Sequence, residues 1–93
     1  MVKADIVNCI AERTGCCKEA VIVVVEELMS TIKNSVITGE NVYLRGFGTF
    51  DTILRREKKY RSKTGVFYIL PEHFEPRFKA CKEFKELVKE AEQ

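Results

Sequence analysis

Basic side chains are concentrated in one stretch of the chain, residues 45–63. This stretch carries seven Lys or Arg and two acidic residues, a net charge of +5, whereas the whole 93-residue chain carries only +2. A second basic stretch, residues 77–89, carries a net charge of +3. Because positive charge is concentrated locally on a nearly neutral protein, the sequence predicts binding to a polyanion at one place.

Catalysis and metal binding would need residue types that this sequence lacks in the required arrangement. We find no nucleophile–base pair, no glycine loop suited to cradling phosphates, and a single histidine, His73. The four cysteines form no Cys-x-x-Cys pair. The sequence therefore predicts a protein without enzymatic activity, cofactor or bound metal. We expect free thiols, and a redox role for Cys16 or Cys17 stays open.

Length and composition predict one small domain. A chain of 93 residues buries a modest fraction of its surface, so association with a second chain is a common way to complete its core. The content of 45% hydrophobic and 32% charged residues is typical of a soluble globular protein. No segment approaches the roughly 20 apolar residues that span a bilayer, and the N-terminal residues lack a signal-peptide core. We therefore expect a cytoplasmic protein, in the nucleoid if the cell is bacterial, with neither a membrane nor a small-molecule substrate as partner.

Apolar residues at helical spacing predict two helices in the N-terminal part of the chain. Residues 3–14 should form a short amphipathic helix that stops at Gly15, and a second helix should run from about Lys18 to Val36 or Thr38. The run Val21–Val25 favours a strand by propensity, but apolar residues continue beyond it at spacings of three and four, so we interpret it as helix. This stripe is wider than one short helix covers, which predicts a partner subunit. A helix–turn–helix DNA reader is the rival interpretation, although an apolar and acidic second helix is ill suited to a DNA groove.

A short strand and a glycine-containing turn should precede the basic stretch. Residues 41–45 alternate in polarity, as expected for a strand. Gly46 and Gly48 permit a tight backbone around Phe47. We interpret Phe47 and Phe50 as core residues rather than as residues that stack on bases.

The basic stretch itself is expected to lie on a projecting β-hairpin. A long strand should run from Thr49 to Arg61, turn through Ser62–Gly65, and return as Val66–Leu70. The alternative explanation of its charges is a solvated edge that is protected against aggregation. The expected cross-strand pairs are Arg61 with Val66 and Tyr60 with Phe67.

The apolar returning strand does not alternate, which suggests that its lower half packs into the sheet. Pro71 should end this strand, and Pro76 should precede a last amphipathic helix from about Ala80 to Ala91. We divide the single expected domain into a helical dimerisation region at 1–40, the sheet and arm at 41–76 with the arm at about 54–70, and the C-terminal helix at 77–93.

The order of these features resembles the bacterial HU and integration host factor family. Two helices, a strand, Gly-Phe-Gly-Thr-Phe, a basic hairpin, and Pro-x-Phe-Lys-x-x-Lys before a short helix follow one another over essentially the whole chain. No single motif decides the resemblance, but the order and the spacing together are specific. The residues that carry it are Gly46–Phe50, Arg55, Arg61, Thr64, Gly65, Pro76, Phe78, Lys79 and Lys82.

The resemblance implies an α+β fold and an intertwined, obligate dimer. Each subunit would contribute to a helical base and would carry a three-stranded antiparallel saddle sheet with a protruding β-hairpin arm. Such proteins bind double-stranded DNA through minor-groove arms and phosphate contacts and bend or compact it with little or moderate sequence preference. We expect a homodimer, with a heterodimer with a paralogue as the alternative.

The resemblance also implies roles for individual residues. The implied DNA-binding residues of the arm and saddle are Arg45, Arg55, Arg56, Lys58, Lys59, Tyr60, Arg61, Lys63 and Thr64. The implied phosphate contacts along the body are Lys3, Lys79, Lys82 and Lys85. The implied dimer core consists of Val25, Leu28, Met29, Ile32, Leu44, Phe47, Phe50 and Phe78.

Two departures from the family pattern affect these expectations. The arm lacks the Arg-Asn-Pro that usually precedes the tip, and its tip is one residue shorter. We therefore expect weaker or smoother DNA bending, unless Tyr60 or Val66 acts as a wedge. Cys81 stands where the family generally has glycine, so the start of the last helix should differ.

A second functional class competes with DNA binding. A dimeric interaction module could dock a protein through the apolar strand Val66–Leu70. Binding through many phosphates weakens steeply with salt, by about 10³-fold or more between 50 and 200 mM, whereas apolar docking should change little. Salt dependence therefore separates the two hypotheses.

Overall fold

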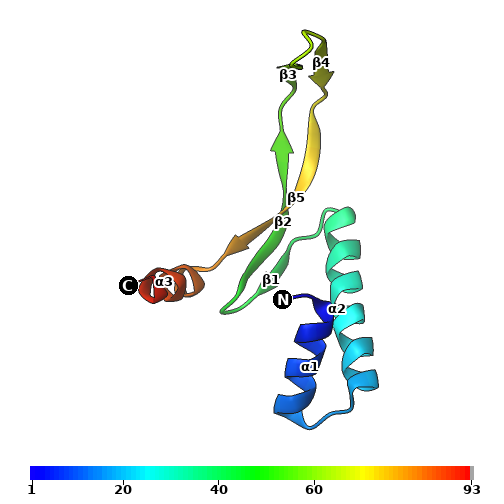
Figure 1. Cartoon of the computed structure of the whole chain (residues 1–93), viewed down its shortest axis with the longest axis vertical. Coiled ribbons are helices and arrows are strands. Elements are labelled where there is room, and N and C mark those ends of the chain that lie inside the picture. Colours follow the sequence, from blue (N-terminus) through cyan, green and yellow to red (C-terminus); the bar gives the residue numbers. More distant parts are fainter. Residues whose placement is uncertain (93) are drawn as a thin grey trace. The chain divides into compact units, whose positions relative to one another are not determined.

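The computed structural model describes residues 1–92 and shows three helices and five strands (Figure 1). The helices are α1 (Lys3–Thr14), α2 (Lys18–Ile37) and α3 (Lys82–Ala91). The strands are β1 (Val42–Leu44), β2 (Gly48–Arg55), β3 (Lys58–Arg61), β4 (Phe67–Leu70) and β5 (His73–Ala80). The chain divides into two compact units, the first Met1–Asn34 and the second beginning at Ser35. The expectation of a single domain stays a prediction.

Local hydrogen bonds explain where α1 begins and ends. The Asp5 carboxylate accepts a hydrogen bond of 2.7 Å from the Val2 backbone N–H, which satisfies one donor at the helix start. Gly15 adopts a positive φ of 75°, and its N–H donates to the Ala11 carbonyl at 2.9 Å. This left-handed residue closes the helix as the sequence predicts.

The valine-rich run Val21–Val25 is helical, as predicted. The continuing apolar stripe at helical spacing outweighs the strand propensity of the β-branched residues. Val7 of α1 and Val21 of α2 are the two buried apolar side chains among the described residues, at 4% and 5% exposure. Past the end of α2, Gly39 has a φ of 85° and donates to the Val36 carbonyl.

The second unit is built on an antiparallel sheet with the strand order β1-β2-β5. A tight turn joins β1 to β2, in which Gly46 has a φ of 80° and the Phe47 N–H donates to the Leu44 carbonyl. The register sets Val42 opposite Phe50 and Phe50 opposite Phe78. This is the expected three-stranded antiparallel sheet.

An aromatic cluster attaches α3 to this sheet. The Phe78 ring lies 4.9 Å from the Phe47 ring and 4.8 Å from the Phe50 ring, and Phe84 of α3 stacks on Phe47 at 5.6 Å. The Cys81 N–H donates to the Phe47 carbonyl at 2.9 Å. These contacts hold the turn, two strands and the last helix together.

The sheet corrects the predicted C-terminal boundaries. Residues 77–80 belong to β5 and not to a helical segment, and α3 begins at Lys82 rather than at Ala80. Pro76 is accepted inside β5 because this strand pairs on one side only, with β2, so its missing N–H removes no bond from a central strand. Cys81 is the N-cap of α3, and its sulfur accepts from the Phe84 N–H at 3.4 Å.

The arm is divided where one continuous strand was predicted. β2 ends at Arg55 and β3 begins at Lys58, while β4 ends at Leu70 and β5 begins at His73. The register is the same on both sides of the gap, so Pro71 lies opposite Glu57. Because proline has no N–H to donate, the ladder is interrupted there. In Figure 1, β3 and β4 continue from the β2–β5 pair at the end away from α3.

Two further predictions about the arm are wrong. Arg61 lies opposite Phe67 and Tyr60 opposite Tyr68, one residue away from the expected pairs, because the Ser62 N–H bonds the Val66 carbonyl and leaves a three-residue tip. Among the described strands β4 pairs with β3 alone, and all four of its side chains are exposed. Its lower half therefore does not pack into the sheet.

Many apolar side chains stay exposed on the single chain. On α2, Val24 is 66% exposed and Leu28 is 52% exposed. Of the expected dimer core, Leu28, Met29, Phe47 and Phe78 are exposed and Val25, Ile32, Leu44 and Phe50 are half-buried. No helix in the described part of the chain is both long enough and apolar enough to span a bilayer.

Candidate nucleic-acid interface

The register of the sheet separates a polar face from an apolar face. Side chains alternate along each strand, so residues paired across the sheet share a face. The apolar face carries Val42, Leu44, Phe50, Leu54, Phe74 and Phe78. The polar face carries Tyr43, Thr49, Asp51, Ile53, Arg55, His73, Glu75, Arg77 and Lys79. Since the apolar face is occupied by the aromatic cluster, the polar face is the one suited to a charged ligand.

An ion pair crosses the middle of the polar face. The Arg77 guanidinium donates from Nε and from a terminal nitrogen to the two Asp51 carboxylate oxygens, both at 2.9 Å. This hydrogen bond lowers the pKa of Asp51 and raises the pKa of Arg77. Arg77 is absent from the predicted site residues, although Lys79 on the same strand and the same face is among them. The signal that could have found it is the alternation of polar and apolar residues from His73 to Ala80.

A second charged cluster lies at the end of the β2–β5 pair, where the arm begins. Arg55 donates from Nε to one Glu75 carboxylate oxygen at 3.1 Å, and His73 Nε2 lies 2.8 Å from the other. His73 Nδ1 lies 2.9 Å from the Pro71 carbonyl oxygen. The Pro71 bond and then the Glu75 bond raise the pKa of His73, while the bonds from His73 and Arg55 lower the pKa of Glu75.

The arm ribbon has one aromatic face and one mixed face. Tyr60 and Tyr68 stack with their ring centroids 5.3 Å apart, and Lys58 and Leu70 form the next pair on that face. On the other face, the Arg61 guanidinium lies 5.4 Å from the centre of the Phe67 ring, beside the Lys59 and Ile69 pair. Such ring contacts fix the side chains of an otherwise isolated two-stranded ribbon.

The arm tip is held by its own hydroxyl groups. Ser62 Oγ and Thr64 Oγ1 lie 2.8 Å apart, and the Val66 N–H donates to Ser62 Oγ at 3.1 Å. Gly65 has a φ of 86°, which the turn requires and glycine tolerates. Thr64, a predicted DNA-binding residue, thus has a structural contact in the turn, and Lys63 is exposed beside it.

Most predicted arm cations form no ion pair within the described part of the chain. Arg55 pairs with Glu75. Within residues 1–92, no ion pair of 4.0 Å or less is formed by Arg56, Lys58, Lys59, Arg61 or Lys63. All five are exposed. They are therefore available to phosphates without breaking an existing salt bridge.

The predicted body cations are distributed over both units. Lys79 lies on the polar face of the sheet, and Lys82 and Lys85 are exposed on α3. Arg45 is exposed in the turn after β1. Lys3 belongs to the first unit, where its Nζ lies 3.0 Å from the Glu26 carboxylate. The structure thus places most of these cations on the unit that carries the sheet.

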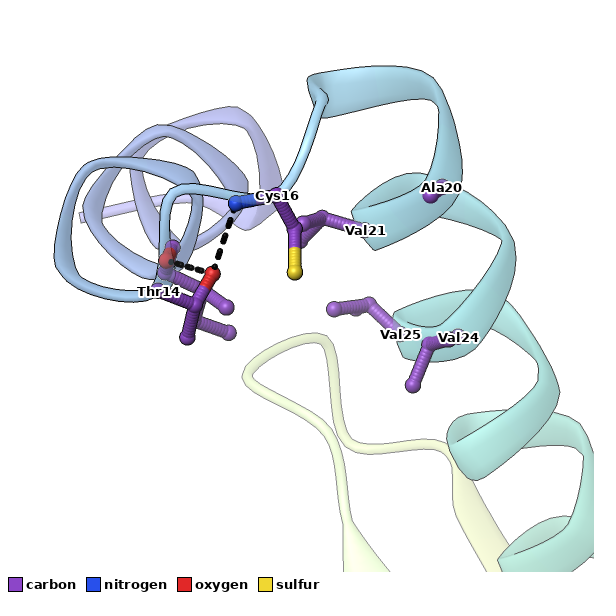
Figure 2. Close-up of a pocket in the computed structure, with 7 residues that line it drawn as sticks. Thr14, Cys16, Ala20, Val21, Val24 and Val25 are labelled. Atoms are coloured by element: carbon purple, nitrogen blue, oxygen red, sulfur yellow. Dashed lines mark hydrogen bonds between the residues drawn. The ribbon is translucent and has the colours of Figure 1, made fainter.

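The first unit contains a pocket of about 190 Å³ with an apolar lining (Figure 2). The polar contacts in it are local, since Thr14 donates to the Ile10 carbonyl and accepts from the Cys16 N–H. Val24 and Val25 of α2 complete the wall opposite. Within residues 1–92, no group of three His, Cys, Asp or Glu residues could hold a metal ion. The pocket is suited to an apolar side chain rather than to a charged ligand.

Comparison with known proteins identifies the family. The family model described as bacterial DNA-binding protein matches residues 1–89. The DNA-binding protein HU of Staphylococcus aureus is 37% identical over 90 residues, which cover 96% of this chain and 100% of that protein. The chain belongs to the HU family of bacterial DNA-binding proteins.

Further members support the assignment. An HU encoded by the SPbeta prophage of Bacillus subtilis is 34% identical and is matched over 98% of its length. Anabaena HU, solved in a cocrystal with DNA, has a TM-score of 0.88 and 32% identity, with coverage of 95% of this chain and 97% of that one. HU from Thermotoga maritima gives a TM-score of 0.68 and 25% identity, with coverage of 95% and 98%. The HU-like α+β fold predicted from the sequence is confirmed.

Proposed function

We propose that this chain is a non-enzymatic architectural DNA-binding protein that binds duplex DNA through its β-arm and the polar face of its sheet. The observation that carries the proposal is the set of five exposed arm cations without an intramolecular ion pair among the described residues. Membership of the HU family and the likeness to an HU solved with DNA support it.

The arm would act mainly through phosphates and the shape of a groove. Lys and Arg contacts to phosphates position a protein on DNA without reading its sequence. The arm is also a narrow two-stranded ribbon of four residues in each strand, β3 and β4. A ribbon of this kind can follow the minor groove, where readout distinguishes little beyond A·T from G·C. Binding with low sequence preference follows.

The remaining predicted site residues receive roles by their position. Lys79 would contact phosphates from the polar face, Lys82 and Lys85 would do so from α3, and Arg45 from the turn after β1. Lys3 would do so from the first unit once DNA competes with Glu26 for it. Among the arm residues, Tyr60 would contribute through its stack on Tyr68 rather than as a free side chain.

The functional form would be a dimer. The apolar stripe of α2 and the apolar pocket of the first unit are exposed on a single chain, and burial of about 25 cal/mol per Å² of such surface favours association. The half-exposed aromatic cluster offers further apolar surface to a partner. A homodimer would present two arms to one duplex, and the location of such a protein would be the bacterial nucleoid.

A mobility-shift titration with a random-sequence duplex of about 30 base pairs tests the function. We expect tight binding at low salt that is lost when Arg56, Lys58, Lys59 and Arg61 are all changed to alanine. A variant with Arg13, Lys18, Lys33 and Lys89 changed to alanine serves as a control, because it removes the same number of exposed positive charges from the helices and none from the arm.

The control separates the arm from general charge effects. It should bind DNA nearly as well as the parent protein. Equal binding by the parent and the arm variant would refute the proposal. Salt-insensitive capture of a protein partner through the exposed strand β4 would then favour the interaction-module hypothesis.

A further inference from the structure

The arm is joined to the sheet through two short unpaired segments that lie at the same level. Arg56 and Glu57 separate β2 from β3, and Pro71 and Glu72 separate β4 from β5. These two backbone segments, with the side chains beside them, connect the β3–β4 ribbon to the β1-β2-β5 sheet. Residues at such a junction can set the position of the arm, because few ladder bonds resist its movement.

The charged cluster of the polar face lies immediately beside this junction. Arg55 and His73 are the last cross-strand pair of the β2–β5 ladder, and both contact Glu75. His73 also contacts the carbonyl of Pro71, which belongs to the junction itself. One imidazole ring therefore connects the junction to the carboxylate that holds Arg55.

The charge state of His73 decides how many of its two contacts can be hydrogen bonds. Both Pro71 oxygen and the Glu75 carboxylate are acceptors, and each lies within hydrogen-bond distance of a separate ring nitrogen. The imidazolium has two N–H donors and satisfies both acceptors at once. Neutral imidazole has one N–H, so one nitrogen lone pair must face an acceptor and that contact is lost.

Protonation also changes the charge that the cluster presents to DNA. With His73 charged, two cations share the single charge of Glu75, and the cluster carries a net positive charge. With His73 neutral, Glu75 compensates Arg55 fully, and Arg55 is held away from phosphates. We propose that His73 is a proton-operated control at the arm junction, which releases Arg55 to DNA when charged and withholds it when neutral.

The direction of the pH dependence follows from the contacts. The bond to the Pro71 carbonyl and then the bond to Glu75 raise the pKa of His73 above its ordinary value of 6.5, while desolvation and then the charge of Arg55 on the neighbouring strand act against them. The charged form therefore persists to a higher pH than in an ordinary histidine and is lost as the pH rises further. DNA phosphodiesters stay ionised throughout this range. DNA binding should thus be tighter at pH 6 than at pH 8.

The experiment measures DNA affinity and the titration of His73 side by side. This inference rests on the proposed DNA binding. His73 is the only histidine of the chain, so its ring protons report its titration in the free protein without assignment. We expect an elevated pKa that decreases in Glu75→Gln and increases when duplex DNA is bound. The parent should bind DNA about three- to tenfold more weakly at pH 8 than at pH 6, which lies below the limit of about tenfold per pH unit that one linked proton per cluster allows.

Variants separate the cluster from other titrating groups. His73→Gln keeps the terminal amine and the thiols but should lose the pH dependence, and Glu75→Gln should bind tightly at both pH values. Asp51→Asn is the matched control, because it removes an acid from the same polar face but leaves the pH profile unchanged. The same pH profile in the parent and in His73→Gln would overturn the inference alone. Failure of the parent to bind DNA at any pH would overturn the proposed function as well.

Discussion

Replacement of Gly48 by alanine should destabilise the protein because the site has no room for a methyl group. A Cβ placed on Gly48 would clash with the Lys79 carbonyl oxygen and would lie 2.7 Å from two ring carbons of Phe78. The oxygen belongs to the backbone of β5, and Phe47 and Phe50 confine the Phe78 ring at 4.9 and 4.8 Å. Neither neighbour can move without disturbing the aromatic cluster.

The magnitude follows from two opposing contributions. Overpacking of this kind costs about 1–3 kcal/mol. Loss of glycine flexibility in the unfolded chain returns about 0.4–1 kcal/mol, since Gly48 has no positive φ that would strain an alanine. A net destabilisation of about 1–2 kcal/mol remains, which lowers the Tm by roughly 4–15 °C for a chain of this size.

Thermal unfolding followed by circular dichroism at one fixed protein concentration measures this loss. Thr52→Ala is the control, because Thr52 is an exposed residue of the same strand and its truncation should stay within about 0.5 kcal/mol. If Gly48→Ala melts at or above the parent temperature, the close approach of β2 to Lys79 and Phe78 is not present in solution.

Three further outcomes follow from the same structure. Cys81→Ser should stabilise α3 by up to about 1 kcal/mol, because a hydroxyl caps the Phe84 N–H better than sulfur does, and urea unfolding would show it. The Arg77 bond lowers the pKa of Asp51 below 3.8, so the stability that this ion pair contributes is present above that value and is lost as the pH falls through the lowered pKa. The free energy of unfolding of Asp51→Asn should therefore differ from that of the parent at neutral pH and converge with it in strong acid. The tip lacks a proline, so DNA circularisation should report weak, smooth bending, and strong bending that neither Tyr60→Ala nor Val66→Ala abolishes would contradict this.

The helices and the first strand could be predicted because each has a period that the sequence displays. Apolar residues at spacings of three and four extend from Val21 to Val36 and identify α2 despite its valines. Gly15 likewise marks the end of α1 through its positive φ. These are local signals, and the structure confirms them.

The resemblance implies a third strand in the sheet, but the sequence pattern does not place it at residues 73–80 because one residue acts against that pattern. His73 to Ala80 alternates polar and apolar residues as a strand does, but Pro76 favoured the approach to a helix. Proline is disfavoured in a central strand but is tolerated in an edge strand. The strand order shows that β5 is an edge strand. Strand order is a property of the whole chain.

The sequence predicts the basic residues of the candidate site but not the ion pairs that some of them form. Local charge density located the basic arm, because it needs only the sequence of residues 45–63. The cluster of Arg55, His73 and Glu75 joins residues 20 apart in sequence through the register of β2 and β5. A one-residue change of register would move Arg55 to a different partner. Sequence alone does not fix that register.

The salt dependence of DNA affinity tests the central claim most directly. Five arm cations per chain lack ion pairs within residues 1–92, which gives about ten in the proposed dimer. If six to ten phosphates are contacted, the logarithm of the binding constant should fall with the logarithm of salt concentration with a slope of about −5 to −9. A slope in that range is the predicted result for the intact protein on a random duplex. A slope near zero would contradict the account, because binding would not then depend on the cationic arm.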